Sequence, residues 1–95
     1  MRRFRQSETD PPWAEKPMYY VYVLKGLGDK LYKGYCSDLR KRFEQHNSGK
    51  IKSTKRLRPL KLIYYEAFES KNSARKEELF LKSGKGRERL KFLFR

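Results

Sequence analysis

Cysteine and long apolar runs are almost absent from this sequence. Its 95 residues contain one cysteine, Cys36, which excludes an internal disulfide and a multi-cysteine metal site. A chain without a disulfide framework is typical of a reducing compartment, so we expect a cytoplasmic protein. No stretch approaches the roughly 18 apolar residues of a membrane helix. The basic N-terminal residues are followed by no apolar segment, so we expect neither a signal peptide nor a membrane span.

Acidic residues are also scarce. The chain has 11 Asp and Glu against 25 Lys and Arg, a formal net charge of +14. In so small a chain this excess favours a polyanionic partner such as a nucleic acid. Ninety-five residues make one domain with a small core, which leaves no room for a separate cofactor-binding domain. Seven Tyr, six Phe and one Trp can fill that core with few residues.

The N-terminal segment differs from the rest of the chain. Residues 1–17 contain Pro11, Pro12 and Pro17 and show no periodic apolar pattern. This composition predicts a flexible tail. We expect one folded domain over residues 18–95.

Apolar periodicity and capping residues predict three strands and three helices. The strands are expected over residues 19–25, 31–35 and 60–68. One helix is capped by Ser37 and runs to about residue 47, and one is capped by Ser70 or Asn72 and reaches residue 83; a short one covers 87–94. This order indicates an α+β fold, in which a small three-stranded sheet, partly antiparallel, is flanked by helices.

The first two strands form a hairpin whose register sets which side chains meet. A turn centred on Leu27 pairs Tyr22 with Tyr32, so that the two tyrosines share one face of the sheet. A turn centred one residue later pairs Tyr22 with Gly34 instead.

The third strand carries large apolar side chains on both of its expected faces. Strict alternation puts Leu62, Tyr64 and Glu66 on one face, and Ile63 and Tyr65 on the other. Because both faces are apolar, the pattern predicts that this is the central strand of the sheet.

Five polar side chains have the spacing and chemistry of a phosphodiesterase site. Tyr32 follows Tyr22 by ten residues, and Arg42 follows Tyr32 by ten. His46 lies one helical turn beyond Arg42, and Glu78 shares a partly apolar helical face with its neighbours. Phosphodiester hydrolysis needs an activated water, a proton acceptor and positive charge, and a metal ion can supply part of this.

The residues around these positions resemble a known family. The run Tyr-Lys-Gly-Tyr-Cys-Ser-Asp-Leu-Arg-Lys-Arg-Phe-Glu-Gln-His-Asn that starts at Tyr32, and residues 74–86, are similar to a GIY-YIG nuclease domain such as that of the bacterial excision-repair nuclease. The resemblance covers about residues 19–89. It implies the same fold and a Mg²⁺-dependent endonuclease that hydrolyses DNA, structure-specific or related to repair, with Mn²⁺ as a substitute ion.

The resemblance also implies a role for each of the five residues. One of Tyr22 and Tyr32 receives a proton from water while the other orients the water or phosphate, and the sequence leaves open which. Arg42 would bind the phosphate, and His46 would shuttle a proton or hydrogen-bond a tyrosine. Glu78 would hold the metal.

Taken alone, the residues also have structural interpretations. Tyrosines are common in strands, and Arg42 lies in a basic helix. A histidine at a helix end is often a surface residue that compensates the helix dipole. Tyr20 and Tyr22 lie on the same face of the expected strand, so strand alternation alone does not show which of them is the tyrosine of the first family motif, Gly-Ile-Tyr. Glu77 competes with Glu78, although we expect Glu77 to be an exposed partner for a lysine or arginine.

Positive charge gathers in the first predicted helix and in the loop after it. We expect these residues to bind the nucleic-acid backbone: Arg40, Lys41, Lys50, Lys52, Lys55, Arg56 and Arg58. Charge does not distinguish DNA from RNA. No DNA-recognition domain accompanies the motif residues, so a partner protein is expected to supply substrate specificity.

The match to the family has three departures. Lys33 stands where the Tyr-Ile-Gly motif of the family has isoleucine, and Tyr35 stands where the excision-repair nuclease has lysine. No asparagine follows Asn72, although many family members have a late one. The alternatives to a nuclease are a non-catalytic nucleic-acid-binding module and a basic structural protein of a ribonucleoprotein.

Overall fold

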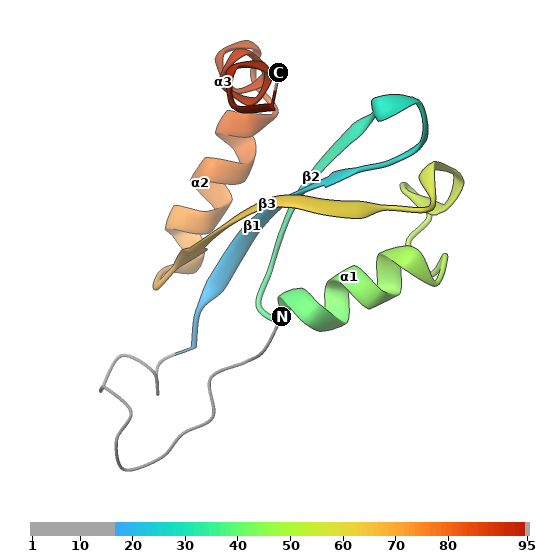
Figure 1. Cartoon of the computed structure of the whole chain (residues 1–95). Helices are drawn as coiled ribbons and strands as arrows, with labels where there is room; N and C mark the ends of the chain where they lie inside the picture. The colour runs from blue at the N-terminus through green and yellow to red at the C-terminus, as the bar shows by residue number, and fades with distance from the viewer. Residues whose placement is uncertain (1–16, 95) are drawn as a thin grey trace.

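The computed structural model describes residues 17–94, so the predicted tail lies outside the described residues except for Pro17. The strands are β1 (Tyr19–Lys25), β2 (Leu31–Cys36) and β3 (Lys61–Phe68). The helices are α1 (Leu39–Asn47), α2 (Lys71–Leu81) and α3 (Gly84–Phe94). The predicted α+β fold with one three-stranded sheet is confirmed (Figure 1).

The sheet has the order β2-β1-β3, and both neighbouring pairs are antiparallel throughout. The prediction that the third strand is central is therefore wrong. The buried centre is β1, in which Val21, Val23 and Leu24 are 0% exposed. β3 lies at an edge, and its residues are all partly or fully exposed.

Helices cover both faces of this sheet (Figure 1). On one side, called the α2/α3 face, a core cluster is formed by Val21, Val23, Ala74, Leu81 and Leu90. On the other side, called the α1 face, a second cluster is formed by Tyr22, Leu24, Cys36, Leu39 and Leu60. Successive β1 residues alternate between the two clusters, as the pleat of a strand requires.

The hairpin register is the second of the two that the sequence allows. Tyr22 pairs with Gly34, and Leu24 pairs with Tyr32, so the prediction of a direct Tyr22–Tyr32 pair is wrong. The turn contains two residues with positive φ, Gly28 (70°) and Asp29 (59°), and its extra length moves the centre of the hairpin. Because the shift is two positions along β2, Tyr32 stays on the face that holds Tyr22.

A β-bulge interrupts the alternation of β3. Val23 pairs with Tyr64 and Leu24 pairs with Leu62, which leaves Ile63 as the extra residue. Ile63 and Tyr64 therefore both pack on the α2/α3 face, while Leu62 packs on the α1 face. A bulge reverses the facing of the residues after it, so the predicted grouping of Leu62 with Tyr64 is wrong.

Local side-chain contacts set the helix boundaries. The carboxylate of Asp38, rather than Ser37, caps α1 by accepting a hydrogen bond from the Lys41 backbone N–H at 3.2 Å. Ser70 caps α2. α3 begins at Gly84, three residues before the predicted start. Within its first turn Gly86 packs directly against the backbone of Phe80, where a larger residue would collide.

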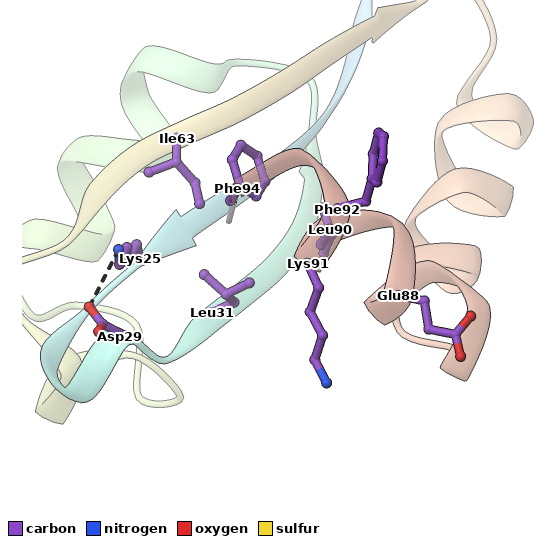
Figure 2. Close-up of a pocket in the computed structure, with 9 residues that line it drawn as sticks. All are labelled: Lys25, Asp29, Leu31, Ile63, Glu88, Leu90, Lys91, Phe92 and Phe94. Carbon is purple, nitrogen blue, oxygen red and sulfur yellow. Dashed lines mark ion pairs between the residues drawn. The ribbon is translucent and has the colours of Figure 1, made fainter.

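A groove of about 880 Å³ lies beside α3 on the α2/α3 face (Figure 2). It is lined by Lys25, Asp29, Leu31, Ile63, Glu88, Leu90, Lys91, Phe92 and Phe94. None of the five candidate catalytic residues is among them, so this groove is separate from the candidate active site. No helix between residues 17 and 94 has the length and apolar character needed to cross a membrane.

Candidate active site

Tyr22 and His46 form the buried centre of the candidate site. Tyr22 is 1% exposed and His46 is 0% exposed. The Tyr22 hydroxyl lies 2.8 Å from Nε2 of His46, and their rings meet edge to face with centroids 5.6 Å apart. This contact joins the central strand β1 to the last turn of α1.

The hydrogen bonds around His46 define its tautomer. The Thr54 hydroxyl donates to the Ile51 carbonyl at 3.4 Å, and Thr54 Oγ1 lies 2.7 Å from Nδ1 of His46. Since the Thr54 proton is already donated, Nδ1–H donates to Thr54 Oγ1. Nε2 is then the acceptor for the Tyr22 hydroxyl. The three hydrogen bonds therefore run in the same direction, from Tyr22 through His46 and Thr54 to the Ile51 carbonyl.

Gly34 makes room for the Tyr22 ring. A Cβ atom at residue 34 would lie 2.6 Å from the Tyr22 hydroxyl oxygen and 3.1 Å from Cε1 of Tyr32. The glycine of the Tyr-Lys-Gly segment is therefore required by the close approach of two aromatic side chains. The observed pairing of Tyr22 with Gly34 follows from the same fit.

Tyr32 lies beside this centre and is the more accessible of the two motif tyrosines. Its ring centroid is 5.0 Å from that of His46 and 6.3 Å from that of Tyr22. Tyr32 is half-buried, whereas Tyr22 is fully buried. The structure thus brings the two tyrosine rings against each other and against His46, although the two residues do not pair directly in the hairpin.

Arg42 adds positive charge to the same cluster. Burial raises the pKa of Tyr22 well above its ordinary value, and the nearby Tyr32 phenol adds to this rise. The charge of Arg42 and its hydrogen bond to Tyr22 act in the opposite direction without cancelling the effect. Tyr22 is therefore a neutral phenol at neutral pH, which leaves its hydroxyl proton on the bond to His46.

His46 is also held neutral. Burial lowers the pKa of its imidazole below the ordinary 6.5, and the charge of Arg42 lowers it further. Burial likewise raises the pKa of the Cys36 thiol to about 11. A thiol of this kind is not a nucleophile at neutral pH, so Cys36 has a packing role on the α1 face.

Glu78 lies apart from the tyrosine and histidine cluster. It is 7% exposed and comes from α2, which packs on the α2/α3 face. Its carboxylate oxygens lie 3.1 Å from Nζ of Lys82 and 3.8 Å from Nε of Arg75. Edge strand β2 separates Glu78 from Tyr32, whose side chain is on the α1 face.

More positive charge gathers on this side of β2. Burial lowers the pKa of Lys33, and the nearby cations Arg87 and Lys82 lower it further. The guanidinium of Arg75 lies over the Tyr35 ring at 5.3 Å. Two positions where the chain departs from the family pattern thus interact with the ion-pair partners of Glu78: Lys33 is repelled by Lys82, and Tyr35 lies under Arg75.

The neighbouring Glu77 has a different environment. Its carboxylate lies 3.0 Å from Nη1 of Arg89 on α3, so the expected ion pair with a basic residue is confirmed. Glu77 is half-buried, so the expectation that it is exposed is wrong. Burial raises the pKa of Glu77, and the nearby Glu66 raises it further. Glu77 therefore belongs to the packing of α2 against α3 and β3.

Glu78 has the donor chemistry for Mg²⁺ or Mn²⁺. Within residues 17–94 no three His, Cys, Asp or Glu side chains gather as a ligand group, so it offers one carboxylate. Mg²⁺ suits such a site, because it keeps several waters and is often held by one or two carboxylates plus substrate phosphates. Lys82 and Arg75 already place positive charge beside both carboxylate oxygens, and their side chains are about half exposed and can move aside.

The predicted nucleic-acid contacts lie on α1 and the loop that follows it. Six of the seven side chains are exposed: Arg40, Lys41, Lys50, Lys52, Lys55 and Arg56. Arg58 is half-buried, lies over Gly49, and donates from Nε to the Lys55 carbonyl at 2.9 Å. Arg58 therefore has a role in holding the loop.

Sequence reasoning missed two residues that organise this loop. Thr54 is 0% exposed and completes the hydrogen bonds of His46. The side-chain amide of Asn47 exchanges two hydrogen bonds with the backbone of Leu60, at 2.8 and 3.0 Å. Thr54 lies between Lys52 and Lys55 in a loop that stands out only for its positive charge, and the position of Asn47 at a helix end gives no sign of its contact with Leu60.

The chain is similar to known proteins over most of its length. A family model described as the GIY-YIG catalytic domain matches residues 18–91. A UPF0213 protein of Bacillus pumilus is 46% identical over 70 residues, which cover 73% of this chain and 71% of the relative. A UPF0213 protein of Pediococcus acidilactici is 40% identical over 78 residues, which cover 79% of this chain and 80% of the relative.

A solved structure gives the same result. The solution NMR structure of a UPF0213 protein from Bacillus halodurans matches with a TM-score of 0.52 at 35% identity, covering 81% of this chain and 85% of that chain. The chain therefore belongs to the GIY-YIG catalytic domain family, and its relatives include the small UPF0213 proteins.

Proposed function

We propose that this protein is a Mg²⁺-dependent endonuclease that hydrolyses phosphodiester bonds of DNA. The observation that carries the proposal is the convergence of Tyr22, Tyr32, Arg42 and His46, from three different elements, into one cluster joined by hydrogen bonds and by edge-to-face and tilted ring contacts. Membership of a catalytic-domain family supports it. The net charge of +14 supports a polyanionic substrate.

Glu78 is the residue that would hold the ion. A bound Mg²⁺ would polarise the phosphoryl oxygen and neutralise negative charge that develops during hydrolysis. The buried position of Glu78 and membership of the catalytic-domain family support this role. Lys82 and Arg75, which pair with its two oxygens, would move aside when the ion binds. Glu77, already paired with Arg89, is the weaker candidate.

The two tyrosines would have unequal roles. The Tyr22 hydroxyl is buried and donates to His46, so we assign Tyr22 and His46 to holding the site in shape. Tyr32 is half-exposed and packs against both of them. We therefore assign to Tyr32 the contact with the attacking water and, in its deprotonated phenolate form, the acceptance of the water's proton.

Positive side chains would bind the phosphate that is cut. Arg42 lies beside Tyr22 and carries a planar guanidinium that can hold a phosphate through two hydrogen bonds. Lys33, Lys82 and Arg87 form a second group of cations, near Glu78. A single carboxylate does not balance their charge, and a phosphate would add negative charge beside them.

The geometry suggests where the substrate strand runs. Tyr32 lies on one face of β2 and Glu78 on a helix that packs against the other face. β2 is an edge strand with one open side. We therefore propose that the reacting phosphate lies at the open edge of β2, where side chains from both faces can reach it.

The experiment is to incubate the purified protein with single-stranded, duplex and branched DNA, and with RNA, in Mg²⁺, in Mn²⁺ and in EDTA. The proposal predicts cleavage of DNA in either metal and none in EDTA. A preference for branched DNA would support a role in repair. Tight binding without cleavage in any condition would contradict the proposal and support a nucleic-acid-binding module instead.

A further inference from the structure

An exposed aromatic side chain lies next to the candidate site. Tyr65 of β3 is 47% exposed. It pairs directly with Tyr22 across the β1–β3 ladder, and directly paired residues have their Cβ atoms about 5 Å apart on the same face. Tyr65 therefore lies one strand away from the buried Tyr22–His46 centre.

The β-bulge is what gives Tyr65 this orientation. Upstream of the bulge Leu62 packs on the α1 face, and strict alternation would send Tyr65 to the opposite one. The extra residue Ile63 reverses the alternation, so Tyr65 faces the α1 side together with Tyr22. Bulges often re-aim a side chain beside an active site, and here the re-aimed side chain is an aromatic ring that stays half in solvent.

Tyr20 provides the second ring. Its centroid lies 6.4 Å from that of Tyr65, with the planes at 60°. Tyr20 is two residues before Tyr22 on β1 and is half-buried against the α1-face cluster. Edge-to-face packing of this kind holds a ring in a fixed orientation, so Tyr20 supports Tyr65 from the side.

Charge indicates what binds on these rings. The helix that covers this face carries three consecutive basic residues in its first turn, Arg40, Lys41 and Arg42. An apolar protein segment would gain nothing from these cations, whereas a nucleic-acid strand would place its phosphates on them and a base on the ring. Stacking on an aromatic side chain requires a base whose face is open.

We propose that Tyr65, supported by Tyr20, forms a stacking subsite for an unpaired nucleobase of the bound strand, on the α1 face and across β1 from the β2 edge where the bond is cut. This inference rests on the proposed nuclease function. Bases inside a duplex are stacked on their neighbours and cannot offer a face to Tyr65. The subsite therefore selects strands that have unpaired nucleotides on the β3 side of the cleavage position.

The test measures binding of the full chain to a fluorescent oligo-dT single strand and to a fully paired duplex, in EDTA so that nothing is cut. Stacking on one aromatic residue contributes about 1–3 kcal/mol per base, so Tyr65→Ala should weaken single-strand binding roughly 5- to 150-fold. Duplex binding should change less than about twofold. Tyr65→Phe should bind like the wild type, because its ring remains.

Two further variants distinguish stacking on the Tyr65 ring from nonspecific binding by exposed apolar side chains. Tyr65→Leu keeps an apolar side chain without a ring and should lose single-strand affinity as Tyr65→Ala does. Phe92→Ala removes a side chain that is 68% exposed on α3 and should leave binding unchanged. Circular dichroism on each variant checks that the fold is retained.

The outcomes distinguish this inference from the nuclease proposal. Normal single-strand affinity in a folded Tyr65→Leu variant, or equal losses on single strand and duplex, would overturn the stacking subsite even if the wild type cuts DNA. A selective loss of single-strand binding would support the subsite even if no substrate were cleaved. A loss in Phe92→Ala as large as that in Tyr65→Ala would also overturn it.

Discussion

The hydroxyl of Tyr22 lies 2.8 Å from Nε2 of His46, with both side chains fully buried. This bond links the central strand to α1, and Thr54 fixes the imidazole from its other side. Burial raises the pKa of the phenol and lowers that of the imidazole. Both groups are therefore neutral at neutral pH, and together they form a rigid support for the more exposed Tyr32.

The two tyrosines should respond differently to the loss of one hydroxyl. Tyr22→Phe leaves the Nε2 acceptor of His46 unsatisfied in a buried site, so the free energy of unfolding should fall by about 1–3 kcal/mol. Tyr32→Phe should leave stability nearly unchanged and reduce cleavage by at least about 100-fold, the usual minimum for removing a proton-transfer group. Urea denaturation and single-turnover cleavage measure the two effects. Loss of stability in Tyr32→Phe with normal cleavage would reverse our assignment.

Gly34 should not tolerate a side chain. Its Cβ would lie 2.6 Å from the Tyr22 hydroxyl oxygen, so Gly34→Ala should destabilise the fold by about 1–3 kcal/mol through overpacking. Gly84→Ala is the matched control, because a Cβ there has no atom within 4 Å. Thermal unfolding followed by circular dichroism compares them. Equal midpoints for the two variants would mean that Tyr22 does not lie across Gly34.

The folded-state pKa of His46 gives a prediction with a definite sign. The pKa is lowered from 6.5 by burial and by Arg42, so the unfolded chain binds a proton more readily than the folded chain. The stability that depends on neutral His46 is therefore full above about pH 6.5 and is lost as pH falls through the lower folded pKa. The other groups that contact His46 are Tyr22, Tyr32 and Thr54.

His46 is the only histidine in the sequence, so its ring proton signals can be followed by NMR without ambiguity. We expect a titration midpoint below 6.5. The destabilisation caused by His46→Gln, measured by urea unfolding, should be greatest near pH 7 and shrink towards pH 5. A midpoint above 6.5, or a destabilisation that grows as pH falls, would contradict a buried neutral imidazole.

DNA binding should depend on salt. Nine basic residues and one acid occupy positions 40–61. If about five phosphates are neutralised, log affinity should fall with log salt at a slope of roughly −4 to −5. Replacing Lys52, Lys55 and Arg56 with Ala should reduce this slope by about 3.

A control triple variant carries the same change of charge elsewhere: Lys71, Lys76 and Lys91 replaced by Ala. Fluorescence anisotropy at several salt concentrations compares the two. Equal changes of slope in both variants would show that net charge alone, rather than the α1 loop, binds the backbone.

The sequence predicted the fold class well because each element has strong local signals. The β-branched and aromatic residues of β1, the Ser70 cap of α2 and the positive-φ residue Gly49 after α1 are properties of short segments. The register of the hairpin between β1 and β2 was harder to predict. The two hairpin registers differ by one residue in the turn centre, and the choice depends on how Tyr22 fits over Gly34, a tertiary contact.

The third strand shows a second limit. Its apolar pattern fits either a central strand or an edge strand that is covered by α3 on one side. The bulge at Ile63 comes from matching β3 to β1, so it has no signature in β3 alone. Tyr65 therefore could not be placed beside Tyr22 from alternation.

The candidate site could be predicted from the sequence only in part, because some of its contacts are tertiary. Spacing identified Tyr22, Tyr32, Arg42 and His46, which the fold brings together. Thr54 lies in a loop whose path depends on the pairing of Asn47 with Leu60, so no local pattern indicates its burial. The sequence pattern predicted which helical face carries Glu78. Its position across β2 from Tyr32 could not be predicted, because it depends on which face of the sheet α2 covers.

Glu78→Gln tests the central claim most directly, because it keeps the shape of the side chain and removes the charge proposed to hold Mg²⁺. The measurement is single-turnover cleavage of labelled DNA in Mg²⁺ by the wild type, Glu78→Gln and Glu77→Gln, with DNA affinity measured in EDTA for all three. Since a metal ion contributes several kcal/mol to the transition state, we expect the cleavage rate of Glu78→Gln to fall by about 100-fold or more, with DNA affinity retained and Glu77→Gln close to wild type. Normal cleavage by Glu78→Gln, or loss of cleavage only in Glu77→Gln, would contradict the account.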